Sequence, residues 1–153
     1  MSEPSAPRPR IVLDTNAWLD LLVFDDPRIG AIREALREAR IEAVTDAACR
    51  EEWRRVLDYP LLALEPDRQG SLMQVFDAVA TRLETPSIAT LPLPRCRDPD
   101  DQKFLELAHA SDARWLVSRD KAVLKLNRRT RKAGLFAIIV PEAWLPTGDA
   151  DAA

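Results

Sequence analysis

Short apolar segments separated by stretches with helical spacing constrain this chain more than any other feature. The apolar segments lie at 10–13, 41–44, 114–117 and 135–140. None of them alternates between apolar and polar residues, so we expect both faces of each strand to be covered. Parallel strands need long crossover connections, which helices usually supply. The pattern therefore predicts an α/β three-layer sandwich with a central, mainly parallel sheet flanked by helices.

The intervening stretches place apolar residues three or four positions apart, as a helix with one buried face requires. Thr45 and Asp46 are suitable caps for a helix that runs to about Leu57, where Tyr59 and Pro60 end it. Further helices are predicted near 18–22, 27–39, 72–83, 101–111 and from Lys121.

The chain has 153 residues, which is the size of one domain. We expect a folded unit at 10–146 between polar tails at 1–9 and 147–153. No apolar run approaches the roughly 18 residues of a membrane helix, and the first residues lack the apolar stretch of a signal peptide. These features indicate a cytoplasmic protein with no membrane segment.

The residue inventory excludes several kinds of site. Neither GxGxxG nor GxxxxGK[ST] occurs, and the chain has only four glycines, which disfavours a glycine-rich nucleotide cradle. His109 is the single histidine, so no Cys/His zinc site can be built. With no secretion signal, Cys49 and Cys96 are most simply two reduced thiols.

Acidic residues follow two of the predicted strands. Asp14 comes directly after IVL, and Asp120 follows WLVSR. Ligands of open parallel sheets collect beyond the carboxyl ends of the strands. Either residue alone could be an ordinary helix cap, but together they bring two carboxylates to the same edge of the sheet.

The helix after the second strand adds a carboxylate on its buried face. Cys49, Glu52, Trp53 and Val56 share one face by their spacing, whereas Glu51 is turned about 100° away. A carboxylate directed into an apolar interface is costly unless it is paired or bound to a metal. Glu52 is therefore the functional candidate, and the alternative is that an arginine satisfies it.

The segment RCRDPDDQKFLELA supplies the last acidic cluster. Asp100 stands where a helix N-cap is expected, and capping is a sufficient role for it. Asp101 begins the stripe that continues with Phe104 and Leu105, so it is expected to point inward. A favourable interaction with the helix dipole is the alternative explanation for an acidic residue there.

A pocket containing Asp14, Glu52, Asp101 and Asp120 would be strongly repulsive without a divalent cation. Oxygen ligands without His or Cys suit Mg²⁺ or Mn²⁺ better than zinc or copper. Such ions activate water and polarise phosphoryl oxygens. The pattern points to phosphodiester hydrolysis.

Four segments, IVLDTNAWLD, EEWRRVL, RDPDDQKFLELA and WLVSRDKAVL, resemble in order and spacing the acidic motifs of PIN-domain ribonucleases. The residues of these segments are especially similar to those of the bacterial toxin components of toxin–antitoxin systems. The resemblance covers about residues 10–145 and implies a five-stranded sheet, dependence on Mg²⁺ or Mn²⁺, and RNA cleavage. It also implies a partner antitoxin and, commonly, a homodimer.

The resemblance places the family's four catalytic and metal-binding acids on the residues already selected, which are Asp14, Glu52, Asp101 and Asp120. Asp98 matches a further acidic position of the subgroup and is an expected supporting or second-metal ligand. Polar positions that support the carboxylates in the family fall on Thr15, Asn16 and Ser118.

A basic segment begins one residue beyond Asp120. From Arg119 to Lys132 there are seven basic residues and one acidic residue, although the whole chain has a net charge of −3. Positive charge beside an acidic centre could hold a phosphate backbone. The candidate RNA-binding residues, which we call the basic run, are Lys121, Lys125, Arg128, Arg129, Arg131 and Lys132.

Two other functions stay open on the sequence alone. One is an RNA- or protein-binding module whose acidic pocket is unused. The other is an aspartyl phosphatase or phosphoacceptor built on Asp14, although the DxDxT arrangement of such proteins is absent.

Overall fold

The computed structural model describes residues 7–84 and 93–146. Its five strands form one sheet in the spatial order β3-β2-β1-β4-β5, and every strand pairing is parallel. The α/β fold class is therefore confirmed. The strands are β1 (Arg10–Leu13), β2 (Glu42–Thr45), β3 (Thr81–Arg82), β4 (Trp115–Val117) and β5 (Ala137–Ile139).

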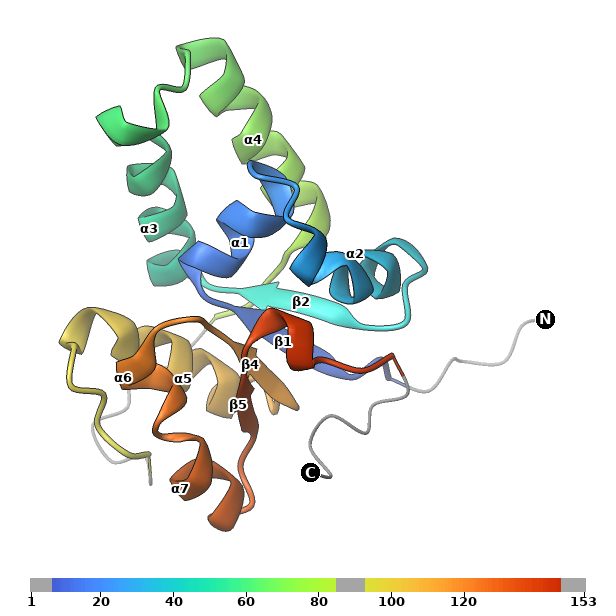
Figure 1. Ribbon diagram of the computed structural model, residues 1–153, viewed down its shortest axis with the longest axis vertical. Coiled ribbons are helices and arrows are strands. Elements are labelled where there is room, and N and C mark those ends of the chain that lie inside the picture. Colours follow the sequence, from blue (N-terminus) through green and yellow to red (C-terminus); the bar gives the residue numbers. More distant parts are fainter. Residues whose placement is uncertain (1–6, 85–92, 147–153) are drawn as a thin grey trace.

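Helices cover both faces of the sheet (Figure 1). One layer contains α1 (Thr15–Leu22), α2 (Gly30–Arg37), α3 (Ala47–Leu57) and α4 (Pro66–Val79). The other contains α5 (Gln102–Ala110), α6 (Lys121–Leu124) and α7 (Asn127–Lys132). Short 3₁₀ turns are η1 (Pro27–Ile29), η2 (Pro60–Leu62), η3 (Pro99–Asp101) and η4 (Pro141–Ala143).

Two hydrophobic cores lie on opposite sides of the sheet because successive strand residues point to opposite faces. Ile11 and Leu13 pack into the core beneath α1–α4, whereas Val12 between them packs into the core beneath α5 and α6. In the first core the ring of Phe76 lies 4.5 Å from that of Trp18 and 5.4 Å from that of Trp53. These contacts fix α1, α3 and α4 relative to one another.

The sequence prediction missed strand β3. The helical pattern was expected to continue to Leu83, but α4 ends at Val79, and Thr81 and Arg82 pair with Val44 and Thr45 of β2. A two-residue strand is too short to show a periodicity, and only its pairing with β2 defines it. Of the expected tails at 1–9 and 147–153, residues 1–6 and 147–153 lie outside the described residues.

The topology creates a crevice between β1 and β4. The chain runs from β1 outward to β2 and β3, and then returns to place β4 and β5 on the other side of β1. Ligands of open α/β sheets bind where the strand order reverses in this way, outside the carboxyl ends of the strands. Among the helices described, none is both long and apolar enough to cross a membrane.

Candidate functional site

Asp14 lies at the carboxyl end of β1 and is the N-cap of α1. Its carboxylate accepts a hydrogen bond from Ala17 N–H at 2.8 Å, which satisfies one of the free amides of the first helical turn. Its own N–H donates to Val117 O of β4 at 3.0 Å, so the pairing of the two strands extends to this residue. The residue is only 5 % exposed. Its position is therefore fixed by both the sheet and the helix.

Asp120 reaches the same edge from β4 and is linked to Asp14 by a serine. It caps α6 by accepting a hydrogen bond from Ala122 N–H at 2.7 Å. Its N–H donates to the hydroxyl oxygen of Ser118 at 3.0 Å, and the Ser118 hydroxyl hydrogen-bonds the Asp14 carboxylate. The fully buried Ser118 thus bridges the two strand ends.

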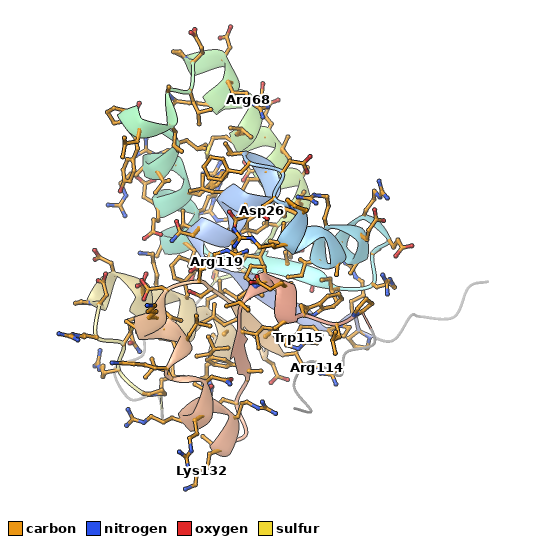
Figure 2. The ribbon with its side chains drawn as sticks, viewed as in Figure 1. Asp26, Arg68, Arg114, Trp115, Arg119 and Lys132 are labelled. Carbon is orange, nitrogen blue, oxygen red and sulfur yellow. The ribbon has the colours of Figure 1, made fainter. Side chains whose placement is uncertain are left out.

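Arg119, between Ser118 and Asp120, forms ion pairs that connect this turn to α1 and η4. Its guanidinium lies 3.0 Å from the Asp20 carboxylate of α1 and 3.0 Å from that of Glu142 in η4. Figure 2 shows Arg119 at the centre of the molecule, where these elements meet. The sequence prediction had placed no role on Arg119, because its partners are about 20 and 100 residues away along the chain.

Glu52 of α3 points toward the site, and both of its oxygens have a partner. One oxygen accepts the Thr15 hydroxyl of α1, and the other lies 2.5 Å from Lys103 Nζ of α5. Glu51 points elsewhere and pairs with Arg54 on the same helix. The expected difference between the two glutamates is confirmed, but the cation that satisfies Glu52 is a lysine rather than an arginine.

The remaining acids belong to η3 and the start of α5. Asp98 caps η3 by accepting a hydrogen bond from Asp100 N–H at 3.0 Å. The expectation that Asp100 is the cap was wrong, because Pro99 places a 3₁₀ turn before the α-helix and moves the cap two residues earlier. Asp101, at the N-cap position of α5, makes no capping bond and is half-buried.

These side chains line one open cavity of about 360 Å³. Not every acid that follows a strand lies in this cavity. Asp46 follows β2 and caps α3, but it lines a different hollow beside β3. Asn16 lies in the cavity wall with an exposed side chain. The polar residues that line the cavity are Asp14, Thr15, Asn16, Glu52, Tyr59, Asp98, Asp100, Asp101 and Asp120.

Burial and mutual repulsion alter the acidity of two of these carboxyl groups. Desolvation raises the pKa of Asp14 to about 7, although hydrogen bonds from Ser118 and Ala17 lower it in part. Desolvation also raises the pKa of Asp101 to about 6, and the negative charges of Asp120 and Asp98 add to the effect. Both groups would become more acidic if a cation were bound among them.

The donor set fits Mg²⁺ or Mn²⁺ by its chemistry, since every candidate ligand is a carboxylate oxygen. Within residues 7–84 and 93–146, no three His, Cys, Asp or Glu side chains converge closely enough to hold an ion. Glu52 is instead engaged by Lys103. An ion and Lys103 would therefore compete for this carboxylate.

The basic run is divided between two sides of the molecule. Lys121 follows Asp120 directly, and Lys125, Arg128, Arg129 and Lys132 are likewise exposed. Arg131 is half-buried and lines a separate hollow with Arg114, near the start of β4 and β5. That hollow lies at the amino ends of the strands, whereas Asp120 follows the carboxyl end of β4. Arg131 is therefore not beside the acidic cavity.

The raised pKa of Asp14 predicts how stability depends on pH in the presence of EDTA. Between about pH 4 and 7 the folded protein binds more protons than the unfolded chain, so the free energy of unfolding should fall as pH rises. Asp14→Asn retains a capping oxygen and removes the charge. At pH 8 we expect this variant to be more stable by about 4 kcal/mol in urea unfolding.

Asp100→Asn is the control, because it removes an exposed carboxylate of the same cavity. It should leave the pH dependence of the wild type unchanged. An Asp14→Asn variant that loses stability at pH 8 would contradict this account of Asp14.

The Lys103–Glu52 pair predicts a second effect on the metal-free protein. Lys103→Met should lower the free energy of unfolding in EDTA by about 1–3 kcal/mol, because Glu52 is left without its cation. Adding Glu52→Gln should recover most of the loss in a double-mutant cycle. Lys125→Met, which alters an exposed lysine, should change stability by less than about 0.5 kcal/mol. Equal losses in the single and double variants would show that packing, and not charge, is responsible.

Comparison with known proteins agrees with this geometry. No curated protein matches the chain. A model of the PIN domain family matches residues 10–122, which include β1, β4 and all five candidate acids from Asp14 to Asp120. Most of the basic run lies beyond the matched residues. The chain therefore belongs to the PIN domain family, whose members are generally nucleases.

Proposed function

We propose that this protein is an Mg²⁺- or Mn²⁺-dependent endoribonuclease that hydrolyses phosphodiester bonds of RNA. The observation that carries the proposal is the gathering of six carboxylates around one cavity at the point where the strand order reverses. Two of these carboxyl groups, Asp14 and Asp101, have raised pKa values, as is common in functional sites. Family membership supports nuclease chemistry in particular.

The candidate ligands of the ion are Asp14, Glu52, Asp98, Asp101 and Asp120. When bound, the ion would supply an activated water and polarise the scissile phosphoryl group. Thr15 and Ser118 would orient the carboxylates, since each already hydrogen-bonds one of them. Lys103 would keep Glu52 compensated until the ion arrives.

The basic run gives a path for the RNA backbone. In the described part of the chain, its five exposed members form no ion pair, so their charges are available to phosphates. The path begins at Lys121, which follows Asp120 in the sequence, and reaches Lys132, the last residue of α7 (Figure 2). We therefore assign RNA contact to Lys121, Lys125, Arg128, Arg129 and Lys132, and omit Arg131.

We further propose a physiological role as the toxin of a type II toxin–antitoxin system. The resemblance of the four acidic segments to toxin components of such systems supports this assignment. An antitoxin that places an arginine against the acidic cavity would supply the countercharge that Lys103 supplies to Glu52. Purification of the chain with its partner, with loss of cleavage in the complex, would test this role, and a homodimer is its expected state.

A binding module without catalysis is the second candidate. It is favoured by one observation, which is that no three of the described acidic side chains converge on a single ion position. Such a module would bind RNA equally well in EDTA and in Mn²⁺ and would not cut it.

Adjacent glutamates allow a matched test of the nuclease. Glu52→Gln should lower the rate of cleavage of labelled single-stranded and hairpin RNAs in Mn²⁺ at least about 100-fold, because it removes a candidate ligand. Glu51→Gln, on the same helix but paired with Arg54, should keep the wild-type rate within about twofold. Asp101→Asn should be as inactive as Glu52→Gln, and EDTA should abolish cleavage by the wild type.

Scission that persists in EDTA would exclude the metal-dependent reaction. RNA binding without scission in any metal would support the binding module instead.

The assignment of the basic run predicts a change in salt dependence. Lys121→Ala combined with Lys125→Ala should weaken the binding of single-stranded RNA in EDTA and reduce the slope of log K against log salt by about 1.4. Arg68→Ala is the control, because Arg68 is an exposed cation of α4 at the opposite end of the molecule from Lys132 (Figure 2). An equal effect of Arg68→Ala would indicate nonspecific attraction rather than a defined path.

A further inference from the structure

Two exposed apolar side chains stand at the mouth of the acidic cavity. Tyr59 is 54 % exposed and Leu61 is 97 % exposed. Both line the same cavity as Asp14 and Asp101. A single exposed leucine is ordinary on a protein surface, but an aromatic and an aliphatic side chain at the rim of a charged cavity form a surface that a ligand can cover.

The backbone that carries this pair is held firmly. Pro60 begins the 3₁₀ turn η2, and Leu62 N–H donates to Tyr59 O at 3.0 Å. The turn ends at Leu62, and the next residue, Ala63, adopts a left-handed conformation with a φ of 50°. Leu62 packs against the first hydrophobic core and anchors the turn. Tyr59 and Leu61 are thus presented to solvent by a short turn that follows the end of α3 (Figure 1).

The lining of the cavity therefore combines two chemically different kinds of side chain. Its carboxylates follow β1 and β4 or come from α3 and the η3 turn, and its apolar surface comes from Leu19, Val56, Leu61, Leu62 and Phe104 and the ring of Tyr59. Its volume of about 360 Å³ is in the range of small-ligand sites. A nucleotide unit of RNA matches both kinds of side chain, because its phosphate can reach an ion held by the carboxylates while its base offers a flat apolar face.

We infer that Tyr59 and Leu61 form a nucleobase-binding subsite, in which an unpaired base stacks beside the phosphodiester bond to be cut. This inference rests on the proposed endoribonuclease function. Aromatic side chains that stack bases contribute to the binding of single strands largely independently of sequence. A base inside a duplex already stacks on its neighbours and cannot offer its face to Tyr59, so the subsite favours single-stranded RNA.

The surrounding charges favour RNA over a protein segment as the occupant. The exposed part of the basic run begins at Lys121, one residue beyond a carboxylate of this same cavity. A polyanion held along α6 and α7 would bring its next nucleotide to the rim.

The experiment measures the affinity of the full-length chain for a labelled single-stranded RNA of about eight nucleotides in EDTA, by fluorescence anisotropy. Tyr59→Ala should weaken binding about 5- to 100-fold, the range that loss of one stacked base produces. Tyr59→Phe keeps the ring and should stay within about twofold of the wild type, and Leu61→Ala should give a smaller loss than Tyr59→Ala. Val75→Ala is the control, since Val75 is an exposed apolar residue of α4 that does not line the cavity.

An RNA series in which an abasic nucleotide is moved along the strand separates stacking from structural damage. At one position the abasic RNA should bind the wild type about as weakly as Tyr59→Ala binds intact RNA, and there the two losses should not add. Additive losses at every position would overturn the inference, as would wild-type affinity in Tyr59→Ala. Failure of the wild type to bind or cut any RNA would instead overturn the proposed function itself.

Discussion

The burial of the Asp14 carboxyl group at the end of the central strand is the constraint on which the site depends. Removing a carboxylate from water is costly, and here two hydrogen bonds, from Ala17 N–H and the Ser118 hydroxyl, offset the cost only in part. The next residue, Thr15, donates to Glu52 of α3. The first turn of α1 therefore joins three elements: its own strand, β4 through Ser118, and α3 through Glu52.

The same arrangement leaves the acidic cavity incompletely neutralised. Lys103 compensates Glu52, whereas the raised pKa values of Asp14 and Asp101 show that their negative charge is disfavoured in the folded protein. Anything positive that binds only the folded state would stabilise it by mass action. A metal ion and a basic residue of a partner protein are thus alternative ways to relieve one electrostatic cost. An aspartyl phosphoacceptor is disfavoured on other grounds, because the DxDxT arrangement is absent and one oxygen of Asp14 already caps α1.

Local patterns predicted the parts of the site that local geometry determines. Asp14 and Asp120 were identified because they follow buried strands, and Glu52 because its helical face is apolar. Lys103 was missed because an inward carboxylate signals that a cation is needed without indicating which one. Arg131 is adjacent to the other basic residues in the sequence but lies apart from them in the fold, because neighbouring positions of a short helix face different directions and α7 turns this residue toward the amino ends of the strands. The position of Asp98 in the cavity wall was suggested by family resemblance alone.

Topology explains why only some strand-end acids belong to the cavity. Asp14, Asp46 and Asp120 each follow a strand and cap a helix. After β1 and β2 the chain enters helices that contribute to the same hydrophobic core, so no opening separates those two strand ends. After β4 it enters α6, which packs in the core on the other face. The crevice must open between β1 and β4, where neighbouring connections leave in opposite directions, and only an acid beside that crevice can share a ligand with Asp14.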